Sequence, residues 1–259
     1  YIDCLSALGF GFLELGTVTP RPQSGNPRPR LFRDRSSRAL INKMGFNNKG
    51  VDHLIINLKN RKTNIPIGIS IGKNFDTPNE LAYQDYLSCL DKIYEFADYV
   101  AINISSPNTK GLRKLEAKKE LHYLLSKIKE RQVDLSEDYG YVPLFLKISP
   151  DNSQDSLREI CEVVKELAID GLICSNTTTN HNFISSKGGL SGKPLMELST
   201  QTLKLSREFL GEDIPIMASG GVMSSSEYKE KLESGANLVQ IYTGFIYEGP
   251  RLIDEILNK

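Results

Sequence analysis

Short apolar runs alternate with longer amphipathic segments along almost the whole chain. The cores of the short runs, such as IGISI, VAINI and LFLKI, are nearly continuous in hydrophobicity, which is typical of parallel strands covered on both faces. The pattern predicts strands over Phe12–Thr19, Pro66–Gly72, Tyr99–Ser106, Pro143–Pro150, Gly171–Thr178, Pro215–Gly221 and Leu238–Phe245.

The segments between these runs have the spacing of amphipathic helices. In the segment 153–168, for example, Leu157, Ile160 and Val164 fall on one face. The expected N-caps of two helices lie within Asp151 to Ser153 and Ser224 to Ser226. Helices are predicted over 51–62, 78–97, 114–132, 153–168, 197–210, 224–235 and 248–258.

Strands that are each followed by a helix predict an α/β fold, and the repeat is one unit short of a closed (β/α)8 TIM barrel. The chain begins at Tyr1, with a helix-like segment, Ile2–Leu8, before the first predicted strand. We therefore expect residues 1–259 to form one barrel domain whose first strand precedes Tyr1 and is missing. An open doubly wound sheet is the alternative, but the GxGxxG turn usual there is absent. The connection 20–48 is the one long irregular excursion.

Composition narrows the class of protein. Lys and Arg number 32 and Asp and Glu number 32, so no net positive charge favours a nucleic acid partner. No signal peptide is visible, and no apolar run reaches the ~18 residues of a membrane span. The four cysteines form no CxxC pair, which predicts reduced thiols rather than a disulfide framework or a metal site.

Amides and hydroxyls gather where the predicted strands end, which is where barrels of this class carry their active sites. The run AINISSPNT, residues 101–109, is the densest example and suits a small ligand with carbonyl and N–H edges. No carboxylate or histidine stands at these positions, so metal hydrolysis and glycosidase chemistry are disfavoured. His53, His122 and His181 are expected at the surface. The strand-end residues are Thr17, Thr19, Ser70, Lys73, Asn74, Asn103, Ser106, Asn108, Lys147, Ser175, Asn176, Thr177, Gly220, Gly221, Tyr242 and Thr243.

Two further features at the strand ends point to an anionic ligand. The last two strands end in glycine-containing turns before predicted helices, where backbone N–H groups bind phosphate, and Gly188–Gly192 adds a third such segment. Lys147 lies in the otherwise apolar run LFLKISP, where a cation is costly unless it is paired. Either Lys147 extends to the rim, or it lies beside a phosphate or an anionic reduced flavin.

With these residues in view, the chain resembles the dihydroorotate dehydrogenase family, and within it the quinone-dependent class 2. The resemblance extends over nearly the whole chain in the family's order. The matching segments are 9–33 (GFGFLELGTVTPRPQSGNPRPRLFR), 40–48 (LINKMGFNN), 68–74 (GISIGKN), 98–113 (DYVAINISSPNTKGLR), 142–151 (VPLFLKISPD), 175–178 (SNTT), 188–195 (GGLSGKPL), 218–222 (ASGGV) and 238–245 (LVQIYTGF).

The resemblance implies an FMN cofactor at the barrel top and dihydroorotate, oxidised to orotate in pyrimidine biosynthesis, beside it. It implies Ser106 as the base that takes a proton from C5 while a hydride leaves C6, with Thr109 and a water near Phe46 as a proton relay. Backbone N–H groups at Gly192, Gly221, Tyr242 and Thr243 would bind the FMN phosphate. The flavin ring or ribityl chain would contact Thr17, Ser70, Asn103, Lys147 and Ser175. Dihydroorotate would be held by Asn42, Lys43, Met44, Gly45, Phe46, Asn103, Asn108, Asn176 and Thr177.

The class within the family depends on Ser106, because class 1 enzymes place a cysteine there. Class 2 implies a membrane quinone as electron acceptor and peripheral association, through a missing N-terminus, with the cytoplasmic side of a cell inner membrane or with the mitochondrial inner membrane. The alternatives are a class 1 enzyme using fumarate or NAD, another FMN barrel such as a tRNA dihydrouridine synthase, or a non-catalytic fragment. Three features depart from the family pattern. Ser70 and Ser175 stand where many members have Asn and Thr, the stretch 179–187 is shorter than expected, and the family's first-strand segment, which ends in a substrate-binding Lys, would lie just before Tyr1.

Overall fold

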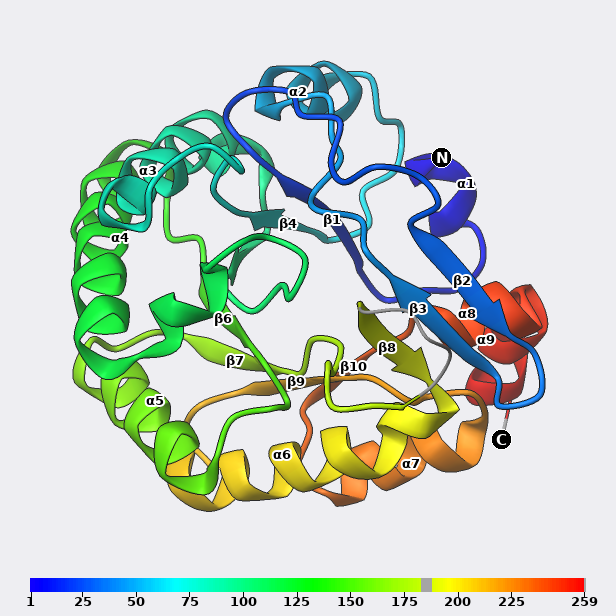
Figure 1. Ribbon diagram of the computed structural model, residues 1–259. Helices are drawn as coiled ribbons and strands as arrows, with labels where there is room; N and C mark the ends of the chain where they lie inside the picture. Colours follow the sequence, from blue (N-terminus) through cyan, green and yellow to red (C-terminus); the bar gives the residue numbers. More distant parts are fainter. Residues whose placement is uncertain (183–187, 259) are drawn as a thin grey trace.

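The computed structural model describes residues 1–182 and 188–258. Its main element is a curved parallel sheet with the strand order β1-β4-β5-β6-β7-β9-β10, as Figure 1 shows. The strands are β1 (Leu13–Val18), β4 (Ile67–Ile71), β5 (Tyr99–Asn103), β6 (Leu144–Ile148), β7 (Gly171–Cys174), β9 (Ile216–Ser219) and β10 (Leu238–Gln240). All seven predicted strands are therefore confirmed, each ending earlier than its apolar run.

Helices surround the sheet on its outer side, and both ends of the chain lie near the last helices (Figure 1). In the part of the chain that the structure describes, no helix is both long and apolar enough to cross a membrane. The α-helices are α1 (Ile2–Ser6), α2 (Val51–Lys59), α3 (Ala82–Ile93), α4 (Lys118–Tyr139), α5 (Gln154–Glu166), α6 (Met196–Leu210), α7 (Ser225–Glu233), α8 (Thr243–Glu248) and α9 (Pro250–Leu257). Short 3₁₀ helices are η1 (Asn79–Leu81), η2 (Tyr94–Phe96), η3 (Leu112–Glu116) and η4 (Lys193–Leu195).

The two faces of the main sheet bury different sets of side chains. Outward residues such as Val100 and Ile102 of β5 join the large core beneath the helices. Alternate residues, among them Tyr99 of β5 and Phe145 of β6, form a separate cluster inside the barrel. Gly171 leaves room for the Phe145 ring, because a Cβ there would lie 2.2 Å from that ring. Because both the outward-facing and the inward-facing residues of these strands are apolar, the sequence does not show the alternation of polar and apolar residues that would reveal which face each one occupies.

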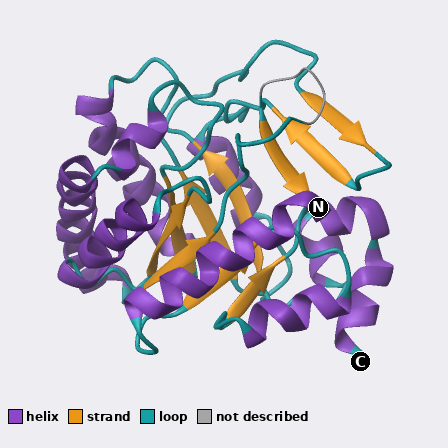
Figure 2. Cartoon of the chain, turned by 60° about the horizontal axis from the view of Figure 1, so that its bottom comes forward, coloured by secondary structure: helices purple, strands orange, loops and turns teal. Residues whose placement is uncertain are grey.

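A second, antiparallel sheet stands beside the ends of the barrel strands, as the turned view in Figure 2 shows. It has the order β2-β3-β8, with β2 (Leu31–Asp34), β3 (Ala39–Asn42) and β8 (Gly189–Gly192). The sequence predicted an irregular excursion over 20–48 and no strand at 189–192, so this sheet was missed. Its strands have four residues each, and β3 pairs with a strand about 150 residues later, so no local pattern reveals it.

The helix boundaries differ from the prediction at two places. α4 continues to Tyr139 instead of ending at 132 and stops at Gly140, whose φ of 82° suits a helix C-terminus. The strand expected over Leu238–Phe245 ends at Gln240, and α8 starts at Thr243. The predicted caps are confirmed at Ser153, which accepts a hydrogen bond from the Ser156 N–H, and at Ser224. The stretch 179–187, which the sequence predicts to be shorter than in the family, lies largely in 183–187, outside the described residues.

Candidate active site

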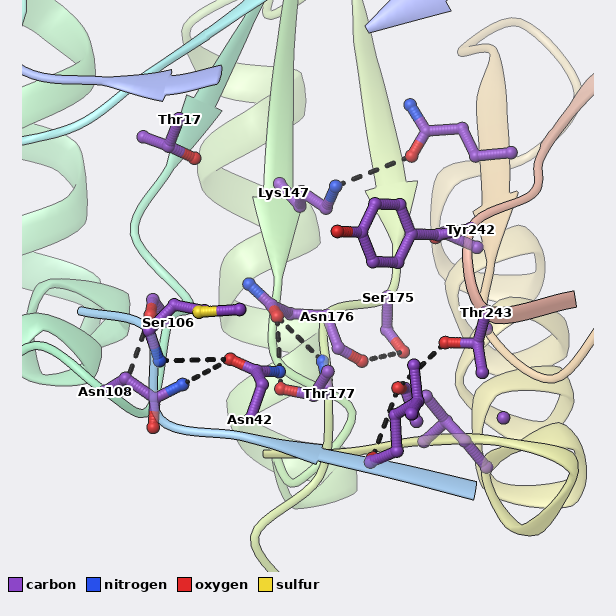
Figure 3. Close-up of a pocket in the computed structure, with 18 of the residues that line it drawn as sticks. Thr17, Asn42, Ser106, Asn108, Lys147, Ser175, Asn176, Thr177, Tyr242 and Thr243 are labelled. Carbon is purple, nitrogen blue, oxygen red and sulfur yellow. Dashed lines mark hydrogen bonds between the residues drawn. The ribbon is translucent and has the colours of Figure 1, made fainter. Parts of the chain in front are cut away.

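A cavity of about 430 Å³ lies at the carboxyl ends of the barrel strands and is covered on one side by the small sheet. Its size is within the range of small-molecule and cofactor sites. Figure 3 shows polar side chains from both sheets and from the strand-end loops directed into it. Of the residues predicted for the site, those that line it are Thr17, Asn42, Met44, Gly45, Phe46, Asn103, Ser106, Asn108, Lys147, Ser175, Asn176, Thr177, Gly192, Gly221, Tyr242 and Thr243.

Four amide side chains converge at one end of this cavity. Asn108 Nδ2 donates to Asn42 Oδ1 at 2.9 Å, which joins the loop after β5 to the end of β3. Asn176 Nδ2 lies 3.3 Å from Asn103 Oδ1 and 3.0 Å from the Ser105 hydroxyl. The amides are therefore oriented by one another and present donors and acceptors to a small ligand with several carbonyl and N–H groups.

Ser106 lies beside these amides, 7% exposed, at the wall of the cavity. Its Oγ accepts a hydrogen bond from the Asn108 N–H at 3.3 Å, which leaves the hydroxyl proton free to be donated. No basic side chain of the described residues is bonded to Ser106. The nearby Thr109 Oγ1 is buried and has no hydrogen-bond partner within residues 1–182 and 188–258, so it has capacity to bond a water or a ligand.

Backbone turns and hydroxyls form the opposite end of the cavity. Gly220 and Gly221 have φ values of 112° and 84°, and a Cβ on Gly221 would lie 2.3 Å from Met196 Cα, so this turn needs glycine. Thr243 Oγ1 donates to Ser191 Oγ at 2.9 Å and ties α8 to β8. A turn of this shape is suited to binding an anion through its backbone N–H groups, and that role stays a prediction.

Two of the residues that the family resemblance assigns to the flavin or the substrate do not line the cavity. Ser70 is buried behind Thr17, with 2.8 Å between the two hydroxyl oxygens, so it positions Thr17. Asn103 Nδ2 donates to the same Thr17 oxygen at 2.8 Å. Lys43 lies in an adjoining groove with Arg28, and its Nζ is 5.7 Å from the Phe32 ring centroid.

Lys147 reaches the cavity from β6, and its partner is a carboxylate of this chain. Nζ lies 3.0 Å from Glu14 Oε1 and 3.5 Å from Gln240 Oε1. Glu14 Oε2 accepts from Gln240 Nε2 at 2.6 Å and from the Tyr99 hydroxyl at 3.2 Å. Burial and the Glu14 charge raise the pKa of Tyr99. Neither expected role for Lys147 included this pair, because Glu14 lies below the strand ends where carboxylates were sought.

Other expectations for single residues need correction. Of the strand-end residues, Thr19, Lys73 and Asn74 do not line the cavity. Asn74 Nδ2 donates to Thr19 Oγ1 at 3.1 Å. Lys73 is buried elsewhere and donates to the Thr77 carbonyl at 2.8 Å, and burial lowers its pKa. His53 is exposed as expected, and His122 pairs with Glu166 at 3.3 Å. His181 is half-buried rather than at the surface, because its Nε2 lies 3.0 Å from the Gly188 carbonyl oxygen.

Several residues that contribute to the site were not predicted from the sequence. Gln240 and Glu14 carried the same signal as Lys147, a polar residue inside an apolar strand, and could have been found by it. Leu31, Leu40 and Ile246 carried no such signal. The missed cavity-lining residues are Gly16, Leu31, Leu40, Asn47, Ser191, Leu195, Ser219, Val222, Gln240, Gly244 and Ile246.

Arg113 in η3 connects three of the strand-end loops behind the site. It donates to the Ser105 carbonyl at 3.0 Å and to the Thr177 carbonyl at 2.9 Å, and it pairs with Asp151 at 2.7 Å. Burial opposes the charged form of Asp151, but hydrogen bonds from the neighbouring threonines and the Arg113 pair outweigh it and lower its pKa. The loop with Ser106 is thereby held against the loop with Asn176.

Glu116 supports the same region from a buried position, and its Oε1 accepts from the Ser149 N–H at 2.7 Å. Burial raises its pKa from 4.5 to about 7, although this hydrogen bond and Arg113 act in the opposite direction. A carboxyl whose pKa is raised on folding destabilises the folded state once the pH exceeds its unfolded value. Stability from this group therefore falls as the pH rises from 4.5 to about 7.

Replacement of Glu116 by glutamine is expected to remove this penalty. The variant should be more stable than the parent at about pH 8, by up to roughly 3 kcal/mol, and no more stable at about pH 4. Urea unfolding at both pH values measures the difference, with the exposed Glu95→Gln as control. An equal effect of Glu116→Gln at both pH values would contradict the assignment.

The fold and the site define an α/β-barrel protein with a cofactor-sized polar cavity at the carboxyl ends of its strands. The chain belongs to the dihydroorotate dehydrogenase family, whose family model matches residues 2–259. It is 51% identical over 265 residues to dihydroorotate dehydrogenase (quinone) of Vibrio parahaemolyticus, covering all of this chain and 79% of that relative. The corresponding protein of Aliivibrio fischeri is 50% identical over the same length, with the same coverage.

Solved structures agree with this family. Dihydroorotate dehydrogenase from Eimeria tenella in complex with ferulenol superposes with a TM-score of 0.91 and 34% identity, covering 97% of this chain and 74% of that one. The ligand-free form of the Eimeria protein has a TM-score of 0.89. The α/β-barrel fold, the family and the quinone-dependent class expected from the sequence are thereby confirmed, and the family uses a flavin cofactor.

Proposed function

We propose that this protein oxidises dihydroorotate to orotate in pyrimidine biosynthesis, with FMN as the hydride acceptor and a membrane quinone as the final electron acceptor. The observation that carries the proposal is the single cavity in which Ser106 faces a cluster of amides at one end and a glycine turn forms the other. One end suits a small ring with several carbonyl and N–H groups, and the other suits a phosphate.

The residues fit a flavin mononucleotide along the length of the cavity. Gly221, Gly192 and Thr243 offer backbone donors for a phosphate, while Thr17 and Lys147 lie at the deeper wall. When bound, FMN supplies the acceptor for the hydride from substrate C6. Lys147 would place a positive charge beside the flavin, balanced by Glu14 when the flavin is neutral.

The amide end would bind and orient dihydroorotate through Asn42, Asn108 and Asn176. Ser106 would remove the C5 proton, so that the C5–C6 double bond of orotate forms as the hydride leaves C6. A serine hydroxyl is a weak base and needs a path for its own proton. The unpartnered hydroxyl of Thr109 supports the relay that the family resemblance suggests.

An apolar rim favours a quinone as the second substrate. Leu31, Tyr242 and Ile246 line the cavity and are 49%, 75% and 38% exposed, so apolar surface borders the site where a hydrophobic acceptor would approach. We further propose that the protein associates peripherally with the cytoplasmic face of a cell inner membrane, because a membrane quinone must reach this rim. The mitochondrial inner membrane is the alternative.

Reduction of the purified protein by dihydroorotate tests the proposal directly. We expect a flavin absorption spectrum, release of FMN rather than FAD on denaturation, loss of flavin colour with dihydroorotate, and its return with a short-chain ubiquinone. Fumarate and NAD are the matched acceptors that should fail. A colourless protein, or one reoxidised by fumarate or NAD and not by quinone, would contradict the proposed function.

A further inference from the structure

A fully buried lysine lies outside the site described so far. Lys231 of α7 is 0% exposed, and its Nζ donates to Ser199 Oγ at 2.7 Å and to Thr200 Oγ1 at 2.8 Å on α6. Within the described residues no carboxylate oxygen lies at ion-pairing distance from it. Burial lowers the pKa of Lys231 to about 8, although the exposed Glu230 acts in the opposite direction. A cation buried without a carboxylate is costly, which calls for a compensating role.

Ser199 connects this lysine to the glycine turn of the cavity. Its hydroxyl lies 3.0 Å from the Gly220 carbonyl oxygen and 3.1 Å from the Met196 carbonyl oxygen in its own helix, so its proton can be donated to either, and the Gly220 oxygen is the nearer. That carbonyl and the Gly221 N–H belong to one peptide unit and point in opposite directions. The hydrogen bonds from the Lys231 ammonium to the Ser199 hydroxyl, and from that hydroxyl to the Gly220 carbonyl, polarise the peptide unit. The Gly221 N–H thereby becomes a stronger donor. This N–H has no acceptor in residues 1–182 and 188–258.

The charges around the cavity leave the glycine end without a cation of its own. Lys147 is the only cationic side chain among the described residues that line the cavity, and it is paired with Glu14. A phosphate monoester bound by the Gly220–Gly221 turn would carry up to two negative charges, with no cationic side chain of the described cavity lining beside that turn. Lys231 is the buried cation behind that turn.

We infer that Lys231 is a specificity-determining residue for the phosphate of the bound flavin, acting through Ser199 and the Gly220 peptide without touching the ligand. The inference rests on the proposed function and deepens it. Lys231 would make the protein bind FMN in preference to riboflavin, which is the same flavin without the phosphate. The stability cost of the buried charge in the protein alone is offset when the phosphate binds.

Flavin titration of the apoprotein tests the inference, with FMN and riboflavin as probes and flavin fluorescence as the readout. The Lys231→Met variant keeps an unbranched side chain one atom shorter than lysine and removes the charge. We expect its affinity for FMN to fall by roughly ten- to a hundredfold and its affinity for riboflavin to stay within about twofold. The apoprotein of this variant should be at least as stable as the parent. Lys204→Met, on the exposed side of α6, is the matched control and should change neither affinity.

The outcomes separate this inference from the proposed function. If Lys231→Met weakens both flavins equally, or neither, the inference is wrong. If that variant does not fold, Ser199→Ala keeps the lysine and breaks the chain to Gly220. It should lower the FMN-to-riboflavin preference, and an unchanged preference would overturn the inference. A parent protein that binds neither flavin overturns the proposed function itself, whereas a parent that binds both equally overturns the inference alone.

Discussion

Replacement of Ser106 by alanine is expected to slow flavin reduction by dihydroorotate by roughly 10²–10⁴-fold, the usual effect of losing a general base, while FMN stays bound. The hydroxyl lines the substrate end of the cavity, and the one hydrogen bond that it makes within residues 1–182 and 188–258, from the Asn108 N–H at 3.3 Å, is long. Its removal should therefore cost proton transfer more than it costs structure. Stopped-flow absorbance of the flavin after mixing with dihydroorotate measures the rate.

Two companion variants sharpen this prediction. Ser106→Cys should retain more activity than Ser106→Ala, because a thiolate can accept the proton. Ser105→Ala removes the neighbouring hydroxyl, which bonds to Asn176 and does not line the cavity, and should have a much smaller effect. Flavin reduction at the parent rate in Ser106→Ala would show that Ser106 is not the base.

Replacement of Lys147 by alanine is expected to weaken FMN retention and to lower the flavin reduction potential, by roughly 30–60 mV. A cation beside the flavin stabilises its anionic reduced form, so its loss makes reduction less favourable. The variant should also lose roughly 3 kcal/mol of stability, because Glu14, which is 15% exposed, is left without its partner. Dye-linked redox titration and urea unfolding measure the two effects.

Glu14→Gln changes the charge beside the flavin in the opposite direction to Lys147→Ala, and it serves as the control for the loss of stability. It removes the negative charge next to Lys147 while an amide still bonds to Tyr99 and Gln240, so the flavin potential should rise. The double variant Glu14→Gln with Lys147→Met should recover part of the stability lost by the lysine variant, since no unpaired charge remains. A Lys147→Ala protein that holds FMN normally with an unchanged potential would make Lys147 a structural residue only.

The main sheet could be predicted because its signal is local. Each strand is a short apolar run with a helix after it, and burial on both faces makes that run continuous in the sequence. The small sheet could not be predicted in this way. Its strands β2, β3 and β8 are short, and their pairing brings Asn42 and Gly189 together across most of the chain.

The same distinction applies to the candidate site. Its amides, hydroxyls and glycines stand at strand ends, so the sequence placed most of them correctly once the barrel was assumed. Ser70 was predicted as a flavin contact and Lys43 as a substrate contact, because the family resemblance implied both. Only packing decides that Ser70 stands behind Thr17 and that Lys43 points into the adjoining groove.

By itself, the sequence determined the order of the barrel strands, the helices between them and the polar residues at the strand ends, because backbone preferences and hydrophobic burial act over a few neighbouring residues. The tertiary structure decided which charges meet. Glu14 and Lys147 are 133 residues apart in the sequence. Lys231 of α7 bonds to Ser199 of α6, which lies 32 residues earlier. Electrostatic partners are set by distance in space and by exclusion of water, and neither follows from spacing along the chain.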